Sequence, residues 1–270
     1  MLKARVSSSV IMMAITVLCM ALGRVTRVLY FAACACICAY ELYKNLKDKD
    51  VLCAFFVFIA YVLGDSVIVI AGLDITWLVA WLAVSVFFAM LSGITNRRID
   101  GKGAFSTVSV LLYPLFSFSL ISRIASSEIW LQSLLLAAAS TWLCDSFALF
   151  GGMLFGKHKV APSVSPNKTI EGCICGALSS LLAGLAVYYI LKASIYIPLH
   201  TCLVTAFIAS SLGQIGDLAE SLIKRMLNIK DTGNLIPGHG GMLDRADSLL
   251  FSIPSAYFCL IAADHIWHFL

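Results

Sequence analysis

Apolar residues form long runs along most of the chain, and short polar segments separate them. The runs approach or reach the roughly 20 residues that a helix needs to cross a bilayer, and strand-like alternation is absent. The pattern therefore predicts an all-α fold, a polytopic integral membrane helix bundle. Nine spans fit best, at Ser9–Gly23, Thr26–Tyr43, Val51–Ile70, Thr76–Ser92, Phe105–Ser122, Trp130–Phe150, Cys173–Leu191, Ile197–Gly216 and Ser248–His268. The first span is short and Gly64-Asp65 interrupts the third, so a count of eight stays open.

Composition supports the membrane assignment. Of 270 residues, 60% are hydrophobic and 13% are charged, whereas a soluble domain carries about 25% charged residues. Lys3 and Arg5 before an apolar run imitate a signal peptide, but the rest of the chain is membrane-embedded, so we interpret that run as the first span. The ten cysteines lie in apolar runs without a zinc or disulfide spacing, which favours packing roles.

The basic residues define an expected orientation. With the N-terminus in the cytoplasm, 15 of the 19 Lys and Arg residues fall in segments on the cytoplasmic side, as the positive-inside rule requires. Their scatter among loops excludes a nucleic-acid partner as the explanation of the net charge of +4. The two largest loops, 151–172 and 217–247, then face the cytoplasm, so we expect the protein in the cytoplasmic (inner) membrane with its chemistry on the cytoplasmic face. We divide the chain into N-terminal membrane helices, 1–125, and a catalytic membrane region, 126–270.

Charged residues concentrate in the segment from Gln214 to Ser248. At about 100° per residue, one helical stripe carries two carboxylates, a hydroxyl and an ammonium. The stripe consists of Gln214, Asp217, Glu220, Ser221 and Lys224. A glycine-dense turn follows, which would let backbone N–H groups approach an anion, and Asp244 and Asp247 then lie three residues apart at the start of the last span.

This combination is typical of phosphate chemistry. Mg²⁺ prefers oxygen ligands, commonly one or two carboxylates together with substrate phosphates, and Asp217 and Asp244 could supply them from two helices. Basic residues nearby could neutralise a triphosphate and a leaving pyrophosphate. These residues are Lys224, Arg225, Lys230 and Arg245. The alternatives are a surface ion-pair network for the carboxylates and, for His239, a turn residue bonded to its own loop.

Two blocks of residues resemble the phosphatidate cytidylyltransferase (CDP-diacylglycerol synthase) family. The first runs from Ser221 to Asp247 and matches the family signature at Ser221, Lys224, Arg225, Lys230, Asp231, Pro237, Gly238, His239, Gly240, Gly241, Asp244, Arg245 and Asp247. The second is Ser165-Pro-Asn-Lys-Thr-Ile-Glu-Gly172, preceded by Asp145, Ala148, Gly152 and Gly156. Leu149 and Met153 depart from the Tyr and Arg usual in the family. The resemblance covers about 145–247, while the first five spans match only in general layout.

The resemblance implies that CTP and phosphatidic acid give CDP-diacylglycerol and pyrophosphate, without a protein nucleophile. It also implies a centre of Mg²⁺ and a second cation, with Asp217 and Asp244 as ligands and Asp145 and Asp247 as further candidates. The substrate-binding candidates are Ser165, Lys168, Glu171, Ser221, Lys230, His239, Gly240 and Gly241. For Asp145 and Glu171, helix-end pairing with Lys157 or Lys168 stays an equal alternative.

Two other classes compete with this interpretation. A transporter with intramembrane acids should show broken helices in two related halves, but the acids and glycines here concentrate in the second half of the chain. A CTP-dependent polyprenol or phytol kinase is distantly similar in sequence, and the complete 221–247 pattern favours the cytidylyltransferase. Membrane lipids are expected partners, and a homodimer stays open.

Overall fold

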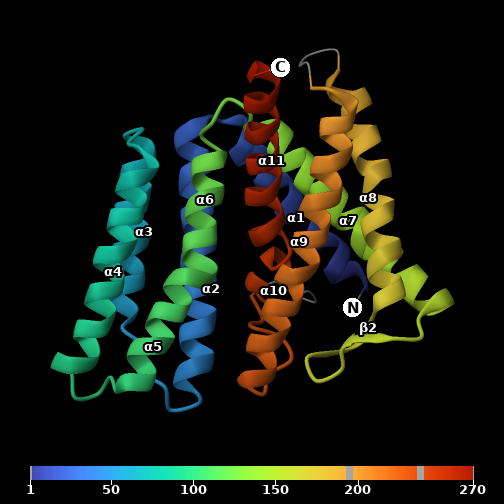
Figure 1. Ribbon diagram of the computed structural model, residues 1–270. Coiled ribbons are helices and arrows are strands. Elements are labelled where there is room, and N and C mark those ends of the chain that lie inside the picture. Colours follow the sequence, from blue (N-terminus) through green and yellow to red (C-terminus); the bar gives the residue numbers. More distant parts are fainter. Residues whose placement is uncertain (1, 193–196, 236–239, 270) are drawn as a thin grey trace. The chain divides into compact units, whose positions relative to one another are not determined.

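The structure, a computed structural model, describes residues 2–192, 197–235 and 240–269, and the side chains of 10–192, 197–235 and 240–263 (Figure 1). It consists of two compact units. Unit 1 comprises Met1–Ser126 and Met226–Arg245, and unit 2 comprises Ser127–Arg225 and Ala246–Leu270. The segment 226–245, which carries the glycine-dense turn, thus packs with the N-terminal helices.

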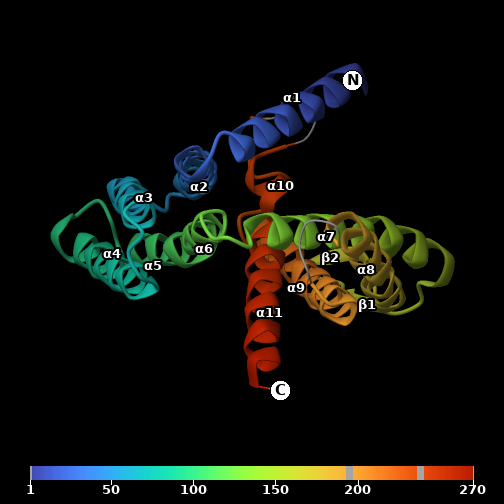
Figure 2. The same ribbon diagram turned by 90° about the horizontal axis from the view of Figure 1, so that it is seen from above.

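Unit 1 is built from α1 (Leu2–Ala21), α2 (Arg24–Lys47), α3 (Phe55–Ile70), α4 (Ile75–Thr95), α5 (Gly101–Val110), η1 (Leu111–Leu115) and α6 (Phe116–Ile124). In the view of Figure 2, α2 and α3 are seen nearly along their axes. Phe58 and Tyr61 of α3 and Leu78 of α4 are fully buried. The last three elements form one kinked span, because Tyr113, before Pro114, leaves helical backbone angles.

The third predicted span is continuous, so the expected interruption at Gly64-Asp65 is wrong. Residues 55–70 form one helix, α3. Gly64 marks a close approach rather than a break, because a Cβ there would overlap the indole ring of Trp81 in α4. The Nε1–H of Trp81 donates to the carbonyl of Tyr61 at 3.0 Å, which fixes the ring against α3. Glycine therefore serves helix packing at this position.

Unit 2 contains α7 (Trp130–Phe155), the strands β1 (Lys159–Ala161) and β2 (Ser165–Thr169), α8 (Ile170–Leu191), α9 (Leu199–Met226) and α11 (Leu249–Phe269). The strands form an antiparallel hairpin in which Lys159 pairs with Thr169. The chain passes from unit 1 to unit 2 within a short helix, α10 (Leu243–Ala246), between Arg245 and Ala246. The core of unit 2 gathers Leu136, Val187, Leu191, Cys202, Ala206 and Leu260.

The predicted all-α membrane fold is confirmed for the described residues, apart from the small hairpin. Seven helices are long and apolar enough to cross a bilayer, and Val10–Ala21 and Phe55–Ile70 are shorter apolar helices. These two correspond to the first and third predicted spans, the ones whose status was open. All ten cysteines are free and none is exposed, as packing residues should be. The orientation of the N-terminus stays a prediction.

We predict that Gly184→Leu destabilises unit 2. A Cβ at Gly184 would lie 2.8 Å from the carbonyl oxygen of Cys202 and 3.0 Å from Cβ of Ala206, so α8 and α9 would have to separate. Overpacking of this kind costs about 1–3 kcal/mol. Thermal unfolding in detergent should show a lower midpoint, whereas Gly101→Leu, where nothing lies within 4 Å of the added Cβ, serves as the control. Equal midpoints for both variants would contradict the close packing.

Candidate active site

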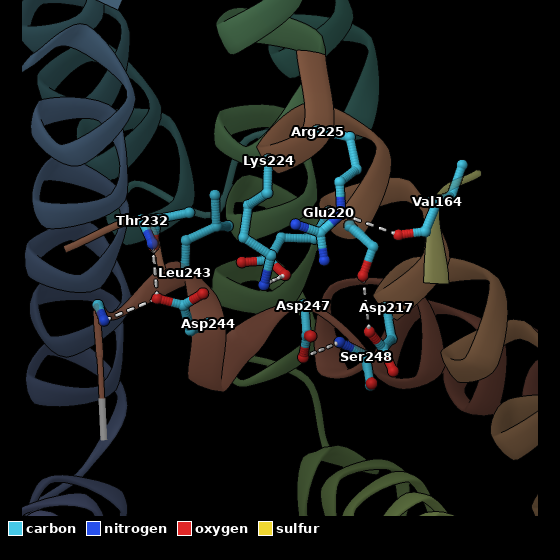
Figure 3. A network of polar contacts seen from close by, with 12 residues as sticks. Val164, Asp217, Glu220, Lys224, Arg225, Thr232, Leu243, Asp244, Asp247 and Ser248 are labelled. Carbon is cyan, nitrogen blue, oxygen red and sulfur yellow. Dashed lines mark hydrogen bonds and ion pairs between the residues drawn. The ribbon is translucent and has the colours of Figure 1, made fainter. Parts of the chain in front are cut away.

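Helix α9 carries the predicted polar stripe on one continuous helix, Leu199–Met226. Gly216 lets this helix pass close to the start of α11. A Cβ at Gly216 would lie only 2.6 Å from the carbonyl oxygen of Asp247 and 3.0 Å from the ring of Phe251. Because the two backbones approach so closely there, the neighbouring side chains Asp217 and Asp247 point into the same region of unit 2 (Figure 3).

Three carboxylates meet at this approach, and we call Asp217, Glu220 and Asp247 the acid cluster. One carboxylate oxygen from each residue lies within 4.8 Å of the others. Glu220 is fully buried, while the Asp217 side chain is 30% exposed. Like charges this close repel one another unless cations compensate them. The acid cluster therefore needs positive partners.

Two lysines supply part of that compensation. Lys168 Nζ lies 2.5 Å from Asp217 Oδ2, and Lys224 forms an ion pair with Glu220 one turn along α9. Ser221 Oγ lies at 3.5 Å from Asp217 Oδ1, and Asp247 accepts the backbone N–H of Ser248 at 2.6 Å. The two lysines thus pair with Asp217 and Glu220, while the three carboxylates stay within 4.8 Å of one another. An acid cluster of this kind is suited to a further cation.

Asp145 extends this electrostatic environment from α7. It interacts electrostatically with Asp217 and with Lys168, although it does not belong to the acid cluster. Gln214, one turn before Asp217, donates to the carbonyl of Cys173 at 3.3 Å. The stripe on α9 is thus tied to both α7 and α8 within unit 2.

The hairpin between α7 and α8 positions Lys168. Thr169 ends β2 and begins α8 as its N-cap, where its hydroxyl accepts the N–H of Gly172 at 3.2 Å. A Cβ at Gly152 would meet this hydroxyl at 3.0 Å, and one at Gly172 would lie 2.6 Å from the carbonyl of Ala148. Two of the glycines singled out in the sequence therefore allow α7, the hairpin and α8 to pack tightly beside Lys168.

Glu171 fixes the start of the hairpin. Its carboxylate accepts the N–H groups of Lys157 and His158 at 3.1 and 3.2 Å and lies 2.6 Å from Nδ1 of His158. Its partners are thus the backbone and His158, not the side chains of Lys157 or Lys168 that the sequence suggested. Arg225, at the end of α9, donates from Nε to the carbonyl of Val164 at 3.1 Å in the hairpin turn (Figure 3). Ser165 lies in β2, at the start of the strand.

Asp244 belongs to unit 1 and has a different environment. Its Oδ2 accepts the N–H of Thr232 at 2.8 Å, the hydroxyl of Thr232 at 2.9 Å and the N–H of Gly241 at 2.8 Å (Figure 3). Gly240 takes the left-handed backbone conformation, with φ of 84°. One carboxylate oxygen therefore closes the glycine-dense turn, and the N–H of Gly241 is already donated inside it.

The structure thus brings only part of the predicted site together within one unit. Asp217, Asp247, Lys168, Lys224 and Ser221 gather in unit 2, whereas Asp244 lies in unit 1. Lys230 and Arg245 are exposed residues of unit 1. His239 lies outside the described residues. The roles assigned to all these residues stay predictions.

The structure places two further acids, Glu220 and Glu41, beside residues of the predicted site. Glu220 was recognised on the polar stripe but given no role, and its complete burial beside Asp217 and Asp247 was not foreseeable. Glu41 is the one acid of helix α2 and lies within the predicted span Thr26–Tyr43, a position that is itself a functional signal. It accepts hydrogen bonds from Met242 and Leu243 in unit 1.

Comparison with known proteins identifies the family of the chain. The model of the cytidylyltransferase family matches residues 3–262. A phosphatidate cytidylyltransferase of Staphylococcus saprophyticus is 34% identical over 218 residues, which cover 81% of each chain. One of Bacillus subtilis is 47% identical over 125 residues, and one of Staphylococcus haemolyticus is 44% identical over 131 residues. These two alignments span 45% and 50% of the relatives' length. The family match over nearly the entire sequence shows that the chain belongs to the cytidylyltransferase family.

Proposed function

We propose that the protein is a membrane enzyme that condenses CTP with phosphatidic acid to give CDP-diacylglycerol and pyrophosphate in phospholipid biosynthesis. The observation that carries the proposal is the acid cluster, three carboxylates from two helix ends with two lysines beside them. Relatives of the protein are named phosphatidate cytidylyltransferases, and the helices that are long and apolar enough to span a membrane suit a lipid substrate.

The acid cluster fits a hard divalent cation. Mg²⁺ is commonly held by one or two carboxylates together with phosphates and water. The carboxylate oxygens of Asp217, Glu220 and Asp247 lie within 4.8 Å of one another, so these side chains are close enough for two or three of them to hold one such ion after they rotate towards it. Mg²⁺ held there would neutralise charge on the phosphate oxygens of the nucleotide. Asp145 and Asp244 are proposed as further ligands, Asp244 on the strength of the signature alone.

The basic residues would act on the phosphates. Lys168 and Lys224 now pair with carboxylates, and each can turn its ammonium towards a phosphate oxygen because its stem is flexible. An oxygen of the lipid phosphate would then form a bond to the α-phosphorus of CTP while the bond to pyrophosphate breaks. Positioning and charge stabilisation suffice for this exchange, so no covalent protein intermediate is required.

Purified protein in detergent should convert phosphatidic acid and radiolabelled CTP to CDP-diacylglycerol when Mg²⁺ is present. Chelation with EDTA should abolish turnover, and added Mg²⁺ should restore it, because the acid cluster needs a cation. Lipid products are separated by thin-layer chromatography. Label transferred from the γ-phosphate of CTP to a polyprenol or other alcohol, with no CDP-diacylglycerol, would instead support the kinase alternative.

We predict that Asp217→Asn lowers kcat by more than about 100-fold, since even outer-shell partners of metal ligands contribute about 10–100-fold. The amount of protein inserted in the membrane should not change. Binding of Mn²⁺, followed by electron paramagnetic resonance, should weaken in parallel and gives a readout besides activity. The control is Asp100→Asn, which removes the same charge at the N-cap of α5, where asparagine caps equally well. Full activity and unchanged Mn²⁺ binding in Asp217→Asn would refute the metal assignment.

The proposed orientation places the acid cluster on the cytoplasmic side of the inner membrane. An epitope inserted between Pro162 and Ser163, in the hairpin, should be reached by antibody only after spheroplasts are permeabilised. An epitope between Gly72 and Leu73, in the turn between α3 and α4, should be reached in intact spheroplasts. The reverse pattern would overturn the orientation and leave the chemistry without access to cytoplasmic CTP.

A further inference from the structure

Glu41 is a buried acid on a membrane-length helix. Glu41 lies near the end of α2 and is only 6% exposed, and it is the single acidic residue of that helix. A carboxylate in such a place costs free energy unless donors surround it. Its partners therefore indicate what the residue is for.

Those partners come from both ends of one segment, 232–243, in unit 1. Glu41 Oε1 accepts the N–H of Met242 at 2.8 Å, and Oε2 accepts the N–H of Leu243 at 3.1 Å. Oε2 also lies 3.3 Å from the hydroxyl of Thr232, at the other end of the segment. One turn further along α2, Asn45 donates from Nδ2 to the carbonyl of Thr232 at 2.6 Å. Helix α2 thus clamps the segment at its beginning and its end.

The same contacts lead to Asp244. The Thr232 hydroxyl lies 2.9 Å from Asp244 Oδ2 as well as 3.3 Å from Glu41 Oε2, so its one proton can be donated to either carboxylate. Glu41 also explains two glycines. A Cβ at Gly233 would lie 2.6 Å from Glu41 Oε1, and one at Gly241 would lie 2.7 Å from Oε2. The backbone around Asp244 is therefore shaped around the Glu41 carboxylate.

We propose that Glu41 is a positioning residue of the cytidylyl transfer, which sets the place of Asp244 by holding Thr232, Met242 and Leu243. The inference rests on the proposed function, because Asp244 takes part in the reaction only if that function is right. Glu41 itself would touch neither substrate nor metal. It acts through backbone N–H donors, which cannot swing away as lysine side chains can.

The test is Glu41→Gln in the full-length protein, purified in detergent. Glutamine keeps the size of the side chain but turns one acceptor oxygen into an NH₂ group that faces backbone N–H donors. Hydrogen–deuterium exchange in peptides covering 241–243 should become more than about 10-fold faster, since a lost buried hydrogen bond is worth about that factor. The kcat should fall about 10–100-fold, because displacements of about 1 Å cost that much, with the KM for CTP changing less.

The matched control is Glu128→Gln, which removes a charge from an exposed residue of the turn before α7. It should leave exchange, kcat and the thermal midpoint unchanged. If Glu41→Gln does not fold, Asn45→Ala removes the hydrogen bonds from Nδ2 to the carbonyls of Thr232 and Glu41 and leaves the Glu41 carboxylate in place. It should raise exchange in the peptide that contains Thr232, with a smaller loss of kcat.

Two outcomes would overturn the proposal. One is unchanged exchange at 241–243 with normal kcat in Glu41→Gln. The other is faster exchange throughout α2 and a lower thermal midpoint, with normal kcat in the fraction that stays folded, as a purely structural residue would give. Wild-type protein that makes no CDP-diacylglycerol would instead refute the proposed function, and the exchange at 241–243 would then still report whether Glu41 holds the segment.

Discussion

Each carboxylate that the fold places on a membrane helix must be compensated by positive charge or by hydrogen-bond donors, and the rest of the site follows from how this is done. The acid cluster in unit 2 is compensated in part by the ammonium groups of Lys168 and Lys224, at the ends of flexible stems. Glu41 in unit 1 is balanced by backbone N–H groups that are fixed in the turn. The first arrangement can exchange partners, whereas the second is permanent. The acids of the acid cluster are therefore suited to bind a ligand, whereas Glu41 is suited to hold the backbone of its own unit in place.

Small residues make the first arrangement achievable. Helices in a bilayer gain stability mainly from close packing, and glycines spaced along α7, α8 and α9 permit it. Gly216 brings the start of α11 against α9, and Gly152 and Gly172 bring α7 and the hairpin against α8. Without the approach at Gly216, Asp247 would lie further from Asp217 and Glu220 on α9. Close helix packing is therefore what brings the charged side chains of unit 2 together.

The sequence predicted those features that depend on local periodicity. Run length identified the helices, and the period of 3.6 residues correctly placed Asp217, Glu220 and Lys224 on one side of α9. It could not reveal that Asp247 would join Asp217 while Asp244 would pack with the N-terminal helices, because these are contacts between distant segments. Glu41 was missed for the same reason, since its partners lie some 200 residues further along the chain. The strands β1 and β2 were missed because they are too short to show an alternating pattern. Gly64 suggested an interruption of the third span because a glycine in a helix can mark either a break or a close approach to another helix.

The ion pair between Lys168 and Asp217 has a thermodynamic consequence. Lys168 directly precedes the N-cap of α8, so it is held near Asp217 whether or not the two are paired. If the protein binds a nucleotide and a metal ion as proposed, a phosphate that takes over the ammonium would leave Asp217 without its counter-charge, so Asp217 would attract the metal ion more strongly. A bound metal ion would likewise release the lysine for the phosphate. By linkage, nucleotide and metal would then raise each other's affinity by the same factor, and one side chain would suffice to make their binding cooperative.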